Sequence, residues 1–218
     1  MRNMTHNPAL ARSSQPELLV LHSVRIQGMA DDDAVAARFG LDEADTREIL
    51  LDYEAYGWVR QAAFAGTAGW SMTDRGRAED DRLLAEELDD AGARSVVERV
   101  HESFVPLNAR LLQACTDWQL RPEADDRLTP NTHTDPEWDA RVLGEFAALG
   151  GELAPLVAEL SSALARFDGY DTRFAAAVGK ARSGKGEWVA GTGMGSCHVV
   201  WMELHEDLIS TLGIQRGA

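Results

Sequence analysis

The fold is decided by the stretch VAARFGLDEADTREILLDYEAYGWVRQ, residues 35–61, together with GWSMTDRGR, residues 69–77. Gly40 permits a tight turn between two short helices, and Asp42 stands where a side chain can cap the first turn of the second helix. Gly57 ends that helix, because glycine readily adopts the left-handed conformation found just beyond a helix C-terminus. The pattern predicts a helix, a turn, a second helix and a strand in close succession.

Elements on either side extend this pattern. Apolar residues within 16–28 predict a buried first helix that stops at Gly28. On the other side, residues 58–64 and 70–72 are typical of strands, with turn-prone residues 66–69 between them. The resulting order of three helices and a two-stranded ribbon is that of a winged helix-turn-helix domain.

The same residues resemble the MarR and PadR types of bacterial transcriptional regulator. In those families the turn falls at Gly-Leu, the recognition helix ends at a Gly shortly before Val-Arg, and the wing returns into Leu-Thr-x-x-Gly-Arg. Here Gly40-Leu41, residues 57–60 and residues 72–77 occupy these places. The resemblance covers about residues 16–77. It implies a protein that binds double-stranded DNA as a homodimer on paired half-sites.

The residues that would meet DNA lie on the third helix and near the wing. The resemblance places Arg47 at a base edge and the wing arginines at phosphates. Carboxylates in the same exposed set, at Glu43, Asp45, Glu48 and Asp52, oppose binding to a polyanion. The candidate DNA-binding residues are Ala44, Thr46, Arg47, Arg60, Arg75 and Arg77.

The composition indicates an acidic globular protein. The chain has 218 residues with 21 Lys and Arg against 36 Asp and Glu, so its net charge is −15, and 44% of it is hydrophobic. These values exclude a disordered chain or a coiled-coil rod, and the charge opposes non-specific binding to nucleic acids or anionic membranes. Cys115 and Cys197 lack metal or disulfide spacing, so we expect both to be buried thiols. With no signal segment or apolar span, the prediction is a cytoplasmic protein that contacts no membrane.

The rest of the chain is predicted to be helical, which makes the fold class mainly α. Pro106 is expected to kink or bound one helix, and residues 184–195 form a glycine-rich loop. The predicted helical stretches are 80–88, 93–120, 136–167, 171–181 and 196–212. The predicted divisions are an arm at 1–15, the winged helix at 16–78, and an all-α dimerisation or effector-binding domain at 79–218.

Polar and aromatic residues interrupt the apolar helices of this second half, which resembles a helical domain of undefined role in actinobacterial regulator-like proteins. Large aromatic anchors with a few orienting polar groups are typical of a small-molecule pocket. The same residues also suit ordinary core packing, and the spacing along separate helices leaves both alternatives open. The candidate ligand-binding residues are Asn108, Trp118, His133, Trp138, His198, Trp201, Glu203 and His205.

The sequence offers no motif for catalysis, a metal or a cofactor. His198 and His205 are seven residues apart, too far along one helix for both to bind one ion without a third element between them. The run GTGMGS at 191–196 lacks the preceding strand and the third glycine of a dinucleotide-binding turn. We therefore predict no catalytic residues, no metal site and no cofactor.

Two functions are favoured by these features, ahead of a third interpretation as an enzyme that uses His198, Glu203 and His205. The first is a dimeric, DNA-binding transcriptional regulator whose helical half senses a small-molecule effector. The alternative is a ligand-binding or protein-interaction module whose acidic winged helix does not bind DNA.

Overall fold

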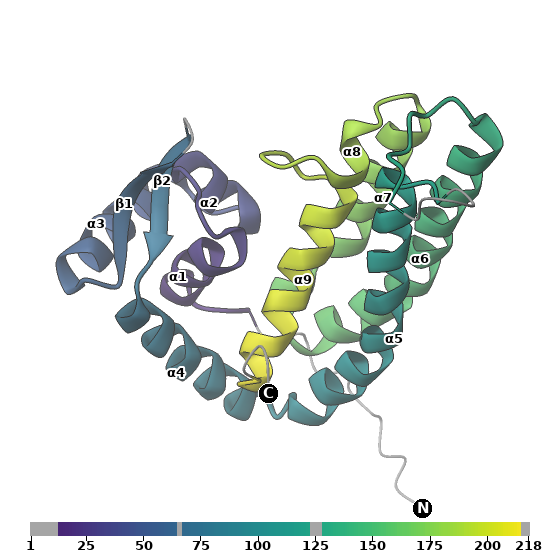
Figure 1. The fold of residues 1–218 in the computed structure, drawn as a ribbon. Coiled ribbons are helices and arrows are strands. Elements are labelled where there is room, and N and C mark those ends of the chain that lie inside the picture. Colours follow the sequence, from purple (N-terminus) through teal and green to yellow (C-terminus); the bar gives the residue numbers. More distant parts are fainter. Residues whose placement is uncertain (1–12, 65–66, 123–127, 215–218) are drawn as a thin grey trace, which may run out of the picture.

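The computed structural model describes residues 13–64, 67–122 and 128–214 and shows a mainly helical chain with one small antiparallel sheet in this part (Figure 1). The N-terminal half is a winged helix-turn-helix domain, as predicted. Its elements are α1 (Pro16–Gln27), α2 (Asp32–Phe39), α3 (Glu43–Tyr56), β1 (Val59–Phe64) and β2 (Thr67–Met72).

Side-chain caps and glycines set the ends of the short helices. The carboxylate of Asp31 accepts the N–H of Ala34 at the start of α2, and that of Asp42 accepts two N–H groups at the start of α3. Gly40 and Gly57 close α2 and α3 in the left-handed conformation, with φ of 66° and 71°. The helix-turn-helix therefore follows from the residues that predicted it.

The strand β2 begins earlier than the sequence predicted. Its register with β1 runs from Val59 opposite Met72 to Phe64 opposite Thr67, so residues 67–69 of the predicted turn lie in the strand, while residues 65 and 66 lie outside the described part. Gly69 allows this because its backbone passes against Ala30, where a Cβ would stand 2.6 Å from the carbonyl oxygen. Trp70 exchanges two backbone hydrogen bonds with Ala30, which ties the wing to the start of α2.

The C-terminal half consists of helices, and several of their ends correct the prediction. Thr73 caps the next helix, so this helix begins well before residue 80. The following helix runs unbroken through Pro106, whose ring lies on an exposed face, where the missing hydrogen bond is least costly. The predicted helix at 136–167 ends at Ala163, and the glycine-rich loop contains a short helix. The elements are α4 (Asp74–Ala91), α5 (Arg94–Gln119), α6 (Pro136–Ala163), η1 (Ala165–Phe167), α7 (Tyr170–Arg182), α8 (Glu187–Ala190) and α9 (Cys197–Leu212).

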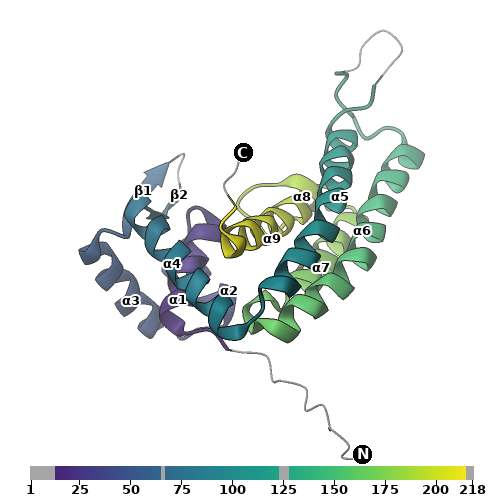
Figure 2. The same cartoon turned by 90° about the horizontal axis from the view of Figure 1, so that it is seen from below.

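The two halves have separate apolar cores. Val20, Leu50 and Trp70 belong to the core of the winged helix, whereas Phe104 and Trp201 belong to that of the helical half. In both views α9 lies between the winged helix and the pair α5 and α6, and α4 leads from one half to the other across the predicted boundary at residue 78 (Figures 1 and 2). The contact between the halves is made mainly by α1 and α4 against α9.

Both cysteines are buried, as predicted. Burial in apolar surroundings raises the pKa of Cys115 to about 11 and that of Cys197 to about 12. Thiols with such pKa values are neutral at pH 7 and therefore poor nucleophiles and metal ligands.

Replacing Gly76 by alanine tests the packing of α4 on the wing. A Cβ at Gly76 would overlap the carbonyl oxygen of Trp58, so Gly76→Ala should lower the free energy of unfolding by about 1–3 kcal/mol. The matched control is Gly151→Ala in α6, where a Cβ meets nothing within 4 Å; it should raise stability by about 0.5–1 kcal/mol. Urea unfolding followed by circular dichroism measures both, and equal effects of the two substitutions would contradict this packing.

Candidate functional site

The helix α3 presents fewer DNA-facing groups than the sequence predicted. Thr46 is only 1% exposed, because it shares the inward side of α3 with Leu50 and Tyr53. The prediction of Thr46 as an exposed DNA contact is therefore wrong. Ala44 and Arg47 are exposed, but the guanidinium of Arg47 lies 3.1 Å from the carboxylate of Asp32 on α2.

Carboxylates surround the helix ends that winged helices point at phosphate. The N-terminal amides of α2 and α3 are already bonded by Asp31 and Asp42, and an anion would have to displace these carboxylates. The outward face of α3 adds further negative charge. Its exposed acidic residues are Glu43, Asp45, Glu48, Asp52 and Glu54.

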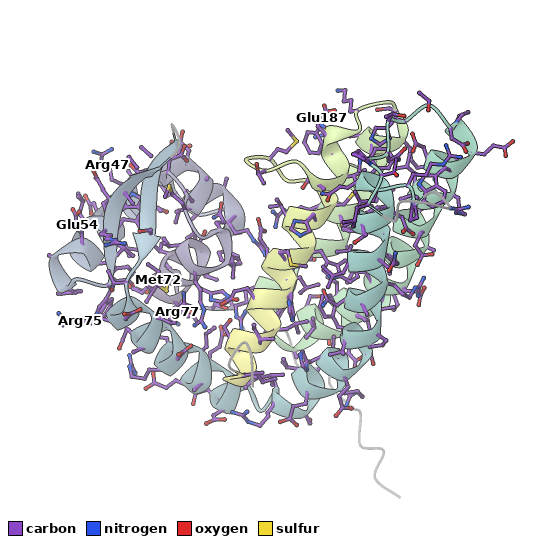
Figure 3. The ribbon with its side chains drawn as sticks, viewed as in Figure 1. Arg47, Glu54, Met72, Arg75, Arg77 and Glu187 are labelled. Atoms are coloured by element: carbon purple, nitrogen blue, oxygen red, sulfur yellow. The ribbon has the colours of Figure 1, made fainter. Side chains whose placement is uncertain are left out.

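The remaining arginines near the wing face either solvent or the helical half. Arg60 and Arg75 are exposed and form no ion pair with any residue in the described ranges. Arg77 instead lies 3.6 Å from the carboxylate of Glu206 on α9. Figure 3 shows Arg47 and Arg75 apart from each other on the outer side, and Arg77 on the side toward α9.

Between the two apolar cores lies a buried cluster of charged groups. The imidazole of His22 in α1 has its Nδ1 3.2 Å from Asp80 of α4 and its Nε2 3.1 Å from Asp207 of α9, and all three side chains are wholly buried. Arg25, also in α1, donates a hydrogen bond to Asp80, and Arg166 of the helical half donates one to Asp207. These contacts join α1, α4 and α9 through charged groups.

The geometry at His22 favours the imidazolium form. Nδ1 bonds a carboxylate oxygen of Asp80 and Nε2 lies 3.1 Å from a carboxylate oxygen of Asp207, and two anionic neighbours favour a hydrogen on both nitrogens. Burial alone would lower the pKa of His22, but the charges of Asp80 and Asp207 outweigh burial and raise it. Burial would likewise raise the pKa of Asp207, but Arg166 and His22 hold it well below its usual range. Asp207 is therefore an anion inside the protein.

We call the buried charged groups between the two halves, which include His22, Asp80, Arg166 and Asp207, the charged seam. Glu203 belongs to this charged seam rather than to a ligand pocket. Its Oε2 lies 2.7 Å from Arg173 of α7 and 3.6 Å from Arg38 of α2. The guanidinium of Arg38 also lies over the rings of Phe39 and Tyr170, at 4.4 and 4.3 Å. Glu203 thus connects the second helix of the winged helix to the helical half.

Three other predicted ligand residues lie in or against the core. Trp201 is wholly buried and donates its Nε1–H to Oδ1 of Asn108 at 3.0 Å. Phe104 stacks on Trp201 at 4.8 Å between ring centroids, and His205 lies 5.8 Å from Phe104. For Asn108, Trp201 and His205 the core-packing alternative describes the structure. His198 is half-buried in the first turn of α9, apart from this group.

Trp118 and His133 do come together at a pocket in the helical half. Their rings are 4.5 Å apart between centroids, and both line a pocket of about 760 Å³ between the end of α5, the start of α6 and the α7–α8 connection. Trp138, a predicted ligand residue, is not among the residues that line this pocket: its Nε1–H donates to the carbonyl of Asp117, and Arg141 lies over its ring. The lining residues are Trp118, Gln119, Asn131, His133, Asp139, Leu143, Ala181, Arg182, Gly184, Gly186, Glu187, Ala190 and Gly191.

Asn131 and Asp139 fix His133 in this pocket. Nδ1 of His133 lies 3.0 Å from Oδ2 of Asp139. The backbone N–H of His133 donates to Oδ1 of Asn131 at 3.0 Å. Asn131 also bonds the carbonyl of Trp118 and Oδ1 of Asp139. His133 has a φ of 56°, a left-handed conformation that costs free energy in a non-glycine residue and that these bonds hold.

The charged seam and the Asn131–Asp139 pair were missed by the sequence reasoning. A single histidine within the apolar run LLVLHSVRI was the available signal for His22, because a buried polar group needs a partner. The spacing of Asn131, His133 and Asp139 was a second signal, since the last of these lies one turn into α6, where it can reach back to the loop.

Comparison with known proteins assigns no family, since no family model, curated protein or solved structure matches this chain. The resemblance to MarR and PadR regulators and the expected homodimer stay predictions. Across the described residues no helix is long and apolar enough to cross a membrane. Within the same ranges no three His, Cys, Asp or Glu side chains are grouped to hold a metal ion.

We predict that the free energy of unfolding falls at alkaline pH because the imidazolium of His22 in the charged seam loses its proton. Because its pKa is raised in the folded state, the contribution is complete below pH 6.5 and is lost as the pH rises through the folded pKa. In that interval the free energy of unfolding should fall by about 1.4 kcal/mol per pH unit relative to His22→Gln. Urea unfolding at a series of pH values measures this difference.

The half-buried His198 supplies the control. Relative to wild type, His198→Gln should leave the alkaline decline unchanged, because His198 is not part of the seam. Wild type and His22→Gln declining in parallel above pH 6.5 would contradict a buried imidazolium at this position.

Proposed function

We propose that this chain is a ligand-binding winged-helix protein that takes a small molecule into the pocket at Trp118 and His133, and whose acidic winged helix does not read DNA. The observation that carries the proposal is the pocket itself. It combines an aromatic side chain with a histidine that hydrogen bonds to Asn131 and Asp139 hold in a costly backbone conformation.

The size and lining of the pocket support small-molecule binding. Its volume of about 760 Å³ falls within the range of roughly 300–1,000 Å³ typical of ligand sites. Trp118, Leu143 and Ala190 supply apolar surface, and the polar or charged lining side chains are Gln119, Asn131, His133, Asp139, Arg182 and Glu187. Sites with this balance gain affinity from apolar burial and specificity from the polar groups.

The charge of the winged helix supports the second part of the proposal. Carboxylates occupy the outward face of α3 and the start of α2, and Arg47 is paired with Asp32. Phosphate contacts supply most of the affinity of DNA-binding proteins, and each carboxylate near a phosphate opposes it. A surface of this charge suits a basic partner better than a nucleic acid.

Binding can be tested with indole, a planar fragment small enough for the pocket. Calorimetry and saturation-transfer NMR should show binding to wild type at one site per chain. Ala190→Trp fills the pocket and should abolish binding, whereas Ala158→Trp on the exposed side of α6 adds the same side chain elsewhere and should leave binding intact. Circular dichroism confirms that each variant is folded.

Two outcomes would overturn the proposal. One is the absence of indole binding to wild type at concentrations where other planar fragments also fail to bind. The other is equal binding by wild type and folded Ala190→Trp, because the indole would then sit outside the pocket.

A second candidate function is DNA binding by a dimer, which Arg60 and Arg75 favour. Both guanidiniums are exposed and free of ion pairs within the described residues, so they remain available for phosphate. A dimer would double this small set of contacts, as paired half-sites require. Against this stands the charge on α3.

Fluorescence anisotropy with duplex DNA from the region upstream of the gene decides between the two. We expect no DNA binding even at about 50 mM salt, a low ionic strength that favours contacts to phosphate. Salt-dependent binding that is lost in Arg60→Ala with Arg75→Ala, and kept in the exposed control Arg99→Ala, would instead establish the second candidate.

A further inference from the structure

Resting on the proposed function, we infer that the pocket selects a planar aromatic molecule carrying a ring N–H or a hydroxyl group, and that Nε2 of His133 accepts that hydrogen. The inference concerns the chemical class of the ligand. It follows from the hydrogen-bond inventory around His133 and from the shape of the pocket walls.

The amide of Asn131 has no hydrogen left for His133. Its Nδ2 carries two hydrogens, and these go to the carbonyl of Trp118 at 3.1 Å and to Oδ1 of Asp139 at 2.9 Å. Nδ1 of His133 lies 3.3 Å from the same nitrogen, which is a longer and secondary contact. Asn131 therefore does not set the proton of the imidazole.

Asp139 instead determines which nitrogen of His133 carries the proton. Its carboxylate only accepts, and its Oδ2 lies 3.0 Å from Nδ1 of His133, so Nδ1 carries the hydrogen and donates it. In a neutral imidazole the other nitrogen then has a lone pair. Nε2 of His133 forms no hydrogen bond with any described residue, the side chain is 43% exposed, and His133 is one of the residues that line the pocket. A ligand that displaces water from Nε2 replaces the lost hydrogen bond by donating one of its own.

The walls of the pocket are suited to a flat ring. One wall is formed by Trp118 and His133, which are both aromatic and lie against each other. The other wall comes from the end of α7, the α7–α8 connection and α8, where several lining residues are small. A Cβ on Gly186 would stand 3.0 Å from the Trp118 ring, so the two walls meet at Gly186 and a ligand has to lie beside this contact rather than across it. The small residues of that wall are Ala181, Gly184, Gly186, Ala190 and Gly191.

A matched pair of probes tests the hydrogen bond separately from the pocket. Indole donates through its ring N–H, and 1-methylindole has the same ring with a methyl group in place of that hydrogen. Wild type should bind 1-methylindole about tenfold more weakly than indole, a difference of about 1.4 kcal/mol that matches the loss of one hydrogen bond. Calorimetry measures both affinities.

His133→Phe isolates the acceptor. Phenylalanine keeps an aromatic ring beside Trp118 and removes Nε2, so this variant should bind the two probes with equal affinity. The control is His101→Phe on α5, outside the pocket, which should keep the wild-type preference for indole.

The outcomes separate this inference from the function on which it rests. If wild type and His133→Phe show the same ratio of affinities, or if wild type binds both probes equally, the assignment of Nε2 as acceptor is overturned while the pocket stands. If neither probe binds wild type, the proposed ligand-binding function fails together with it. If wild type binds indole about tenfold more tightly than 1-methylindole and this difference disappears in His133→Phe, both are supported.

Discussion

The arrangement of the two halves depends on a histidine held between two buried aspartates. His22 bonds Asp80 on α4 and Asp207 on α9, and Arg166 and Arg25 balance these carboxylates from either side. Removing any one partner would leave an uncompensated buried charge, which is far more costly than losing a surface ion pair. We expect the seam to favour one relative orientation of the winged helix and the helical half, because a shift between them would separate these pairs.

Much of the fold could be predicted because local signals and tertiary packing agree. Asp42, Gly40 and Gly57 act as caps and turn residues in the structure as they do in the sequence pattern. The errors fall where tertiary contacts override local preference. Gly69 looks like a turn residue, yet it is needed in a strand because Ala30 passes so close; Pro106 looks like a helix boundary, yet its side of α5 is exposed.

The candidate site was predictable only in part. Trp118 and His133 are adjacent in the structure, but their partners Asn131 and Asp139 come from a loop and a helix whose approach no spacing rule fixes. Trp201 carries the same aromatic signal and lies in the core, because α9 is covered on both sides. Residue type identified candidates, and only packing could separate a pocket wall from a core.

The central claim is that a planar ligand binds at Trp118 and His133, and NMR can locate such binding directly. A titration of ¹⁵N-labelled protein with indole should shift the Trp118 indole N–H and the amides of His133 and Gly186, while α3 and the wing stay unchanged. Shifts confined to the winged helix, such as that of the Trp70 side chain, would place the ligand elsewhere. That result would contradict the account.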